Sequence, residues 1–302
     1  MANNGSFKRV AVVVKRSVYD KALEQPDDRL HKLLEQGDPT VAYVRRAHEE
    51  HVGTVAEVKA ALQESGAEVT RIRRRRDGFD DGEFDLVLTV GGDGTLLHTS
   101  QFVADTPILG INSAPSSSVG FFCGVRKGEV AMAMRNAMRN KLKRATLTRM
   151  MVTLNGDTVS SRVLNDALFC HQSPAATSKY IVEYDGIKEE HKSSGLWIGP
   201  AAGSTAAQRS AGGKVLPLSS KNLQLVVREP YAPTGKGNRL SRVIIKPGQL
   251  LRVRSKSRHM RMYLDGPDNM VRVSLGDVLE FTQSPEPLHL LGISPRRKWG
   301  ED

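Results

Sequence analysis

The strongest constraint on the fold is a change of sequence pattern near residue 145. Before it, short apolar runs such as VAVVV at 10–14 alternate with stretches whose apolar residues recur every three or four positions, as at 41–62. This alternation is typical of a parallel sheet with helices on both faces. After it, short β-type segments follow one another, and Asn155-Gly156 between two apolar runs indicates a hairpin. The sequence therefore predicts α/β plus all-β: an N-terminal doubly wound, Rossmann-like domain and a C-terminal β-rich, sandwich-like domain.

Three segments follow from this pattern. We expect an α/β domain at 1–145, a β-rich domain at 146–285, and a polar C-terminal tail at 286–302 that docks back on the first domain or frays. Within the first domain the pattern predicts strands at 9–14, 67–72, 84–90 and 107–111, and helices at 41–62, 95–103 and 130–138.

Composition narrows the class of protein. The apolar runs are too short to span a bilayer, and the N-terminus MANNGSFKRV has no apolar segment typical of a secretory signal. The two cysteines, Cys123 and Cys170, cannot form a disulfide framework. We therefore expect a cytoplasmic protein with no membrane partner.

The net charge of +11 leaves several kinds of partner open. The densest basic run is RIRRRR at 71–76, and the acidic stretch DGFDDGEFD follows it directly. We favour the interpretation that the basic and acidic runs form a solvated edge and neutralise each other's charge, over a role of the basic run in holding ATP phosphates. Nucleic-acid binding is the weakest interpretation because no aromatic residues accompany the arginines.

A glycine-rich turn follows the apolar run at 86–90, where the chain reads Gly91, Gly92, Asp93, Gly94, Thr95. Gly92 and Gly94 allow positive φ, and without a Cβ they would let an anion approach the backbone N–H groups at the start of the next helix. A phosphate would repel Asp93, so this carboxylate needs a compensating role. It could contact magnesium or remove a proton from an attacking hydroxyl, or it could merely cap the helix.

Other familiar sites have no counterpart in the sequence. The phosphate-binding patterns G-x-x-x-x-G-K-[ST] and G-x-G-x-x-G after a strand are missing, and Ser204 is not in a G-x-S-x-G turn. No His/Cys/Asp cluster has the spacing of metal ligands, so we expect no protein-held metal and Mg²⁺ to arrive with ATP.

The sequence resembles the NAD kinases. Their GGDGT motif is shared with the wider superfamily of diacylglycerol, sphingosine and phosphofructo-kinases, and four further stretches narrow the resemblance. These are LGINSAPSSSVGFFCG at 109–124, with an insertion at 113–118, VLNDALF at 163–169, SSGLWIGPAAGSTAAQRSAGG at 193–213 and YLDGPDN at 263–269. The resemblance covers roughly residues 85–270.

The resemblance implies an ATP- and Mg²⁺-dependent kinase that phosphorylates the adenosine-ribose 2′-hydroxyl of NAD⁺ or NADH. Asp93 would be the base that takes the proton of that hydroxyl. The residues that would cradle ATP phosphates are Gly91, Gly92, Gly94 and Thr95. The residues that would bind NAD are Asn112, Phe121, Asn165, Asp166, Thr205, Ala206, Ser210 and Asp265. The resemblance further implies a homo-oligomer, a dimer or a tetramer.

The departures from the family pattern concern the choice of substrate. Ser194 stands where the family usually has an acidic residue, and Ala207 where it usually has Tyr. These changes are similar to those of the plant NADH kinase branch. The loss of a carboxylate at Ser194 removes a partner for a cationic nicotinamide, so we expect neutral NADH to be tolerated, and the choice between NAD⁺ and NADH stays open. The alternatives are a lipid kinase of the same superfamily and, less favoured, a nucleic-acid-binding protein. The phosphoryl donor, ATP or polyphosphate, stays open.

Overall fold

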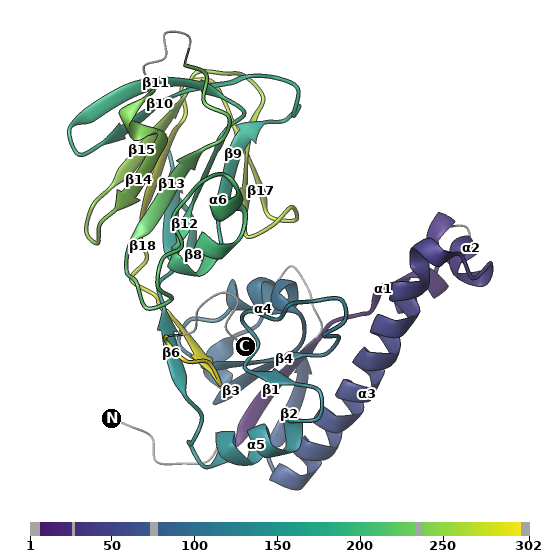
Figure 1. The fold of residues 1–302 in the computed structure, drawn as a ribbon. Coiled ribbons are helices and arrows are strands. Elements are labelled where there is room, and N and C mark those ends of the chain that lie inside the picture. Colours follow the sequence, from purple (N-terminus) through teal and green to yellow (C-terminus); the bar gives the residue numbers. More distant parts are fainter. Residues whose placement is uncertain (1–6, 26–27, 73–77, 233–236, 297–302) are drawn as a thin grey trace. The chain divides into compact units, whose positions relative to one another are not determined.

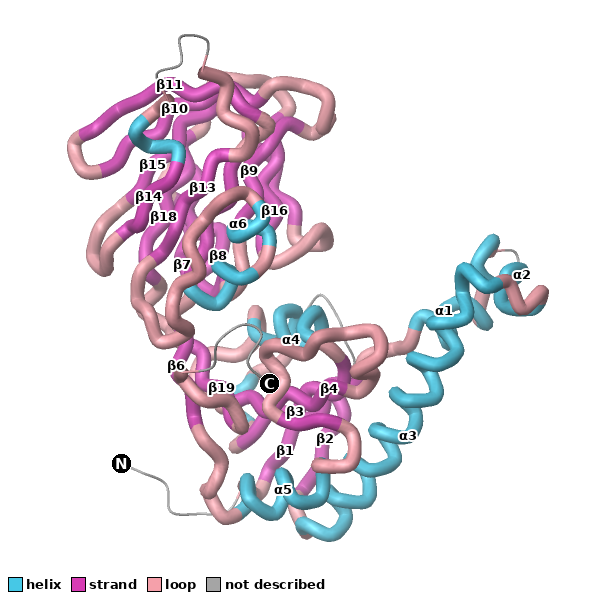
Figure 2. Tube along the Cα trace, in the orientation of Figure 1, coloured by secondary structure: helices cyan, strands magenta, loops and turns pink. Residues whose placement is uncertain are grey.

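The computed structural model describes residues 7–25, 28–72, 78–232 and 237–296. The chain divides into two compact units, and each is described by itself (Figures 1 and 2). The first unit is Met1–Ala145 with His289–Ser294, and the second is Thr146–Leu288 with Pro295–Asp302. Within the described residues, no helix is both long enough and apolar enough to cross a membrane.

A seven-stranded sheet with the order β2-β1-β3-β4-β19-β6 forms the first unit, and β5 pairs with β4 off this path. The pairs of β1 with β2 and β3, and of β4 with β3, β5 and β19, are parallel. Its strands are β1 (Arg9–Val14), β2 (Glu68–Ile72), β3 (Leu86–Gly91), β4 (Ile108–Asn112), β5 (Val125–Arg126), β6 (Arg144–Leu147) and β19 (Leu288–Leu291).

Helices cover both faces of this sheet (Figure 1). Residues of α3 and α5 share one apolar cluster with alternate residues of β1, β3 and β4, whereas Leu96 of α4 lies against Gly110 on the other side of the sheet. The long helix α3 ends where Gly66 adopts φ 68°, which L side chains rarely adopt. The helices are α1 (Val18–Leu23), α2 (Arg29–Glu35), α3 (Ala42–Ser65), α4 (Asp93–Ser100) and α5 (Val130–Met138), with 3₁₀ turns at Pro39–Val41 and Asp81–Glu83.

Two six-stranded antiparallel sheets form the second unit, with the orders β11-β10-β15-β18-β7-β8 and β14-β13-β12-β9-β16-β17. The predicted hairpin is present, because Asn155 and Gly156 both adopt positive φ between β7 and β8. The strands are β7 (Met150–Leu154), β8 (Asp157–Val163), β9 (Ala167–His171), β10 (Ser178–Tyr184), β11 (Ile187–Ser193), β12 (Leu196–Pro200), β13 (Leu223–Val227), β14 (Arg242–Ile245), β15 (Leu251–Ser255), β16 (Met260–Leu264), β17 (Met270–Val273) and β18 (Val278–Gln283). Short helical segments are Ala201–Thr205, α6 (Ala207–Ser210) and Arg239–Ser241.

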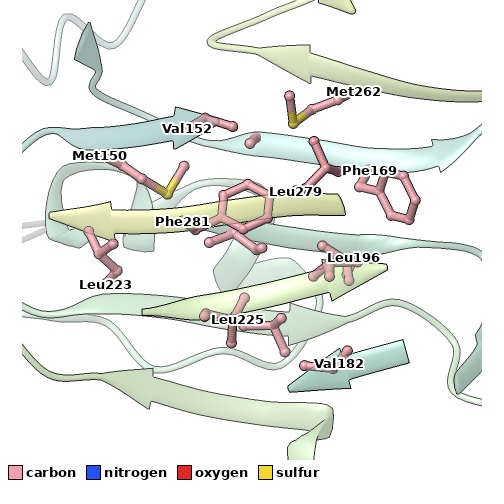
Figure 3. Close-up of a cluster of buried hydrophobic side chains, with 14 of the residues drawn as sticks. Met150, Val152, Phe169, Val182, Leu196, Leu223, Leu225, Met262, Leu279 and Phe281 are labelled. Carbon is pink, nitrogen blue, oxygen red and sulfur yellow. The ribbon is translucent and has the colours of Figure 1, made fainter. Parts of the chain in front are cut away.

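The core of the second unit lies between its two sheets. Figure 3 shows Val152 and Phe281 of one sheet among Phe169, Leu225 and Met262 of the other, and all five are fully buried. Inward-facing residues alternate with outward-facing ones along these strands, as in a β-sandwich. The predicted fold class is therefore confirmed.

The C-terminal segment and the basic run are only partly described by the structure. The segment 286–302, expected to be a tail, contains β19, which pairs with β4 in the sheet of the first unit. Of the basic run, Arg71 and Ile72 end β2, whereas 73–77 lie outside the described residues, as do the terminal residues 297–302.

Candidate active site

Three neighbouring strand ends in the first unit meet around the glycine turn. Val14 pairs with Val90, and Gly91 pairs with Asn112, so the carboxyl ends of β1, β3 and β4 are in register. The N–H of Lys15 donates to the Val90 carbonyl (2.9 Å) and that of Ser113 donates to the Gly91 carbonyl (2.9 Å), which continues the ladder past the strands. Ligands of open α/β sheets bind at such an edge.

The glycines of the turn serve close packing rather than left-handed backbone. Gly92 has φ −108°, and neither Gly92 nor Gly94 uses the positive φ that glycine allows. A Cβ on Gly91 would overlap with the Thr95 hydroxyl, and one on Gly92 would overlap with the Ser118 hydroxyl. At Gly94, by contrast, a Cβ would meet no protein atom within 4 Å. Close packing therefore explains why residues 91 and 92 are glycines. No protein atom packs against Gly94, so a ligand can approach its backbone.

Asp93 does not cap the helix in the way the simplest interpretation assumes. Gly92 is the N-cap of α4, and Asp93 lies in the first turn. Its carboxylate instead accepts hydrogen bonds from the backbone N–H groups of Phe121 (2.9 Å) and Phe122 (2.7 Å). The carboxylate thus joins the glycine turn to a loop nearly thirty residues further along the chain. The sequence contained no signal for this contact.

The insertion at 113–118 packs against both α3 and the glycine turn. Ser113 lies 2.8 Å from Nδ1 of the buried His51, and Ser116 donates to Glu50 (2.8 Å). Asn112 is buried and donates through Nδ2 to the Ser118 carbonyl (2.9 Å), while its Oδ1 has no hydrogen-bond partner among the described residues. The insertion therefore fixes Ser118 over Gly92.

In the second unit, Asp265 organises the Asn165-Asp166 turn. Its carboxylate accepts the backbone N–H groups of Leu164 (2.8 Å), Asn165 (2.6 Å) and Asp166 (3.1 Å). In return the Asp265 N–H donates to the Asp166 carbonyl (2.9 Å). Both oxygens of Asp265 thus bind protein backbone, which gives Asp265 a positioning role, and the NAD contact that the resemblance implies stays a prediction.

Glycines bring the GSTAA segment against the same turn. A Cβ on Gly199 or Gly203 would overlap with the main-chain carbonyl of Asn165, so only glycine allows this approach. Ser204 is buried and donates to the Ala201 carbonyl (2.7 Å), which makes it a structural residue. The predicted NAD-binding residues in this segment are at least partly accessible on the second unit: Thr205, Ala206 and Ser210.

Asp166 is a buried carboxyl beside a second carboxyl. Burial, and then the charge of Asp265, raise the pKa of Asp166 to about 7. Burial also raises the pKa of Asp265 to about 6, against the opposing effect of its three N–H donors. With a pKa of about 7, Asp166 keeps its proton below neutral pH, and its side chain also accepts from Asn165 Nδ2 (2.7 Å). A protonated carboxyl can donate to a ribose oxygen, which an ionised one cannot.

This pair predicts a pH dependence of stability. The unfolded chain releases the Asp166 proton near pH 4, whereas the folded protein keeps it up to about pH 7. The free energy of unfolding should therefore fall as pH rises from 5 to 7, by about 1.4 kcal/mol per pH unit for this group. Urea unfolding of wild type and Asp166→Asn at pH 5 and pH 8 checks this. The variant should gain stability relative to wild type at pH 8, and an equal difference at both pH values would contradict the assignment.

The predicted site residues thus form two groups, one in each unit. The first holds Gly91, Gly92, Asp93, Gly94, Thr95, Asn112 and Phe121, and the second holds Asn165, Asp166, Thr205, Ala206, Ser210 and Asp265. The described residues include no group of three His, Cys, Asp or Glu that could hold a metal ion. Neither Cys123 nor Cys170 is in a disulfide.

Solved structures share this combination of units. An NAD kinase from Archaeoglobus fulgidus in complex with ATP matches with a TM-score of 0.65 at 19% identity, covering 93% of this chain and 92% of that one. The yeast NADH kinase complexed with NADH matches with a TM-score of 0.66 at 15% identity, covering 96% of this chain and 84% of that one. At these identities the likeness establishes the fold of NAD kinases.

Sequence relatives establish the family. The profile of the ATP-NAD kinase N-terminal domain matches residues 10–142. A probable NADH kinase from Oryza sativa is 31% identical over 263 residues, which are 80% of this chain and 81% of that one. The NADH kinase of Arabidopsis thaliana is 34% identical over 241 residues, 71% of this chain and 76% of that one. The chain belongs to the NAD kinase family, as the resemblance predicted.

Proposed function

We propose that the chain transfers the γ-phosphate of ATP to the adenosine-ribose 2′-hydroxyl of NAD⁺ or NADH, and so makes NADP⁺ or NADPH. The observation that carries this proposal is the glycine turn at the end of β3, which presents one carboxylate, Asp93, beside the open backbone at Gly94. A phosphate-binding turn needs no carboxylate, but a kinase that deprotonates an alcohol does.

The predicted residues take separate roles in the proposed reaction. Backbone N–H groups at the start of α4 bind the phosphates of ATP and stabilise the charge that spreads over the transferred group. Asp93 accepts the proton of the 2′-hydroxyl: a carboxylate offers about four lone-pair sites, and the bonds from Phe121 and Phe122 engage two of them. Asn165 and Asp166, fixed by Asp265, bind the dinucleotide.

Magnesium is expected as part of the substrate. Mg²⁺ usually binds proteins through one or two carboxylates together with substrate phosphates, and it keeps several waters. The described residues offer no three-ligand cluster, so we assign the ion to the triphosphate and derive no step through a metal held by the protein.

NADH is the favoured dinucleotide. Ser194 is a neutral residue at the position where the family usually has a carboxylate. A cation lies nearby, because Nη1 of Arg228 is 3.5 Å from the Ser194 carbonyl oxygen. Neither the neutral Ser194 side chain nor the Arg228 guanidinium attracts a cationic nicotinamide ring, whereas the neutral ring of NADH is not repelled by them. Both plant relatives named above are described as NADH kinases, which supports the same preference.

The test is an assay of the purified chain with ATP, Mg²⁺ and either NAD⁺ or NADH. The product is read by a dehydrogenase that accepts only 2′-phosphorylated dinucleotide. We expect turnover with both substrates and a higher kcat/KM with NADH. A tenfold advantage of NAD⁺, about 1.4 kcal/mol, would reject the preference, and a lack of product with either dinucleotide would reject the function.

Replacing Gly94 with Ala separates folding from phosphate binding. The added methyl group meets no protein atom within 4 Å and the residue is helical, so we expect the free energy of unfolding to rise by about 0.4–1 kcal/mol. Turnover should nevertheless fall, because the methyl group occupies the space that we assign to the phosphates. Thermal unfolding and steady-state kinetics on the same sample check both effects. Full activity in a stabilised Gly94→Ala variant would show that no ligand approaches this backbone.

We further propose that the enzyme is cytoplasmic and homo-oligomeric. Neither of its two cysteines is in a disulfide, and Cys123 is buried, as in proteins of reducing compartments. Light scattering of the purified chain tests the oligomeric state, and a monomer at micromolar concentration would reject a dimer or tetramer.

A further inference from the structure

Lys15 occupies a position that neither the family motifs nor the proposed reaction explains. It directly follows β1, and its N–H bonds to Val90, so it lies beside Gly91 at the carboxyl edge of the sheet. Its Cβ is 3.1 Å from the place where a Cβ on Gly91 would be. The Cβ of Lys15 therefore lies beside the first glycine of the turn.

The ammonium group of Lys15 has no counter-ion within the described part of the chain. The residue is half-buried, and no described carboxylate lies within 4 Å of it. Its neighbour Arg16, by contrast, is exposed and paired with Glu24. Burial and the charge of Lys21 both lower the pKa of Lys15. A partly desolvated cation without a partner costs free energy unless an anion compensates for it.

The surrounding residues fix Lys15 rather than neutralise it. The ring of the buried His51 interacts with the main chain of Lys15 and hydrogen-bonds to Ser113 (2.8 Å). Burial, with a further effect of Lys15, lowers the pKa of His51, so His51 joins β1 to the end of β4 as a neutral ring. Asp20 is engaged with Ser17 (2.8 Å). The local structure thus holds Lys15 in place beside the glycine turn.

We propose that Lys15 binds the polyphosphate group of the phosphoryl donor at the glycine turn. This proposal rests on the proposed kinase function and adds a residue to it. The turn supplies backbone N–H donors and the carboxylate of Asp93, but no positive side chain, whereas a triphosphate carries several negative charges. Lys15 supplies the missing cation from the adjacent strand, as a point charge that suits phosphate.

Lys15→Met tests the proposal because it keeps the stem and removes the charge. We expect the Kd for Mg²⁺-ATP, measured by calorimetry, and the KM for ATP to rise roughly 10- to 100-fold. Binding of inorganic tripolyphosphate should weaken similarly, since the contact is to phosphate and not to the nucleoside. Lys15→Arg should retain most of the affinity. Lys59→Met, which removes an exposed cation from α3, is the matched control and should bind as wild type does.

Stability distinguishes this role from a structural one. The ammonium group of Lys15 has no described counter-ion in the free protein, so without nucleotide Lys15→Met should have a Tm equal to or above that of wild type. With Mg²⁺-ATP its Tm should rise less than that of wild type. Unchanged Kd values for both ATP and tripolyphosphate would overturn the proposal, even if the wild type phosphorylates NADH. Binding does not require turnover, so a wild type that binds tripolyphosphate through Lys15 but makes no product would reject only the proposed function.

Discussion

Replacing Asp93 with Asn should lower kcat by at least ~100-fold, because general-base assistance typically contributes about 10²–10⁴-fold. The structure adds a second expected effect. An amide has one oxygen, so one of the N–H groups of Phe121 and Phe122 would face an NH₂ group instead of an acceptor. We expect this to lower the free energy of unfolding by about 1–3 kcal/mol. Single-turnover kinetics and denaturant unfolding on the same sample measure the two effects.

The control for this experiment is Asp81→Asn. Asp81 is a buried carboxylate of the same unit that accepts N–H groups of Ala104 (3.0 Å), Asp105 (3.3 Å) and Thr106 (3.1 Å). Like Asp93→Asn, the Asp81→Asn variant loses one negative charge from a carboxylate that binds the backbone of a loop. We expect it to lower the free energy of unfolding and to leave kcat unchanged. If Asp93→Asn and Asp81→Asn lowered kcat equally, the role of Asp93 would be structural only.

Replacing Asp265 with Asn should weaken dinucleotide binding more than it slows the chemical step. The variant keeps one oxygen acceptor and places an NH₂ group against one of the three N–H groups of the 164–166 turn. Since an unsatisfied buried donor costs about 1–3 kcal/mol, we expect a loss of stability of this size and a rise of more than tenfold in the KM for NADH. Because Asn tolerates positive φ, the φ of 52° at this position does not complicate the result.

Asp277→Asn is the matched control in the second unit. Asp277 accepts the N–H of Ser274 (2.7 Å) and the side-chain amide of Asn155 (2.9 Å), so it also holds a turn through both oxygens. We expect this variant to lose stability with an unchanged KM. An unchanged KM in Asp265→Asn as well would mean that the 164–166 turn does not position the dinucleotide.

Most of the fold could be predicted from local sequence patterns. The periodic helix α3, the apolar strands β1, β3 and β4, and the Asn155-Gly156 hairpin all depend on residues that are neighbours in the chain. Short elements without a strong period were missed, among them α1, α2 and β9. The strand β12 (Leu196–Pro200), which ends at a proline and lies within the motif at 193–213, was also not predicted.

The candidate site was predictable in its residues but not in its contacts. GGDGT pointed to Asp93, yet the bonds to Phe121 and Phe122 join positions far apart in sequence, and no local pattern encodes them. The same holds for Asp265, whose role emerges only when its three N–H partners are known. The glycines show the limit most clearly, because glycine serves either positive φ or close approach, and the sequence does not distinguish these uses.

The position of β19 has a consequence for how the chain can be divided. Because residues 290 and 291 pair with β4, the chain returns to the first unit after the second, and it passes between the two units at three points, 145/146, 288/289 and 294/295. A fragment that ends at residue 145 therefore lacks a strand of its own sheet and leaves the backbone of Ile108 and Leu109 unpaired on one side. During synthesis Ile108 and Leu109 therefore gain this strand neighbour only after residues 290 and 291 have been made, later than residues 146–288 of the second unit.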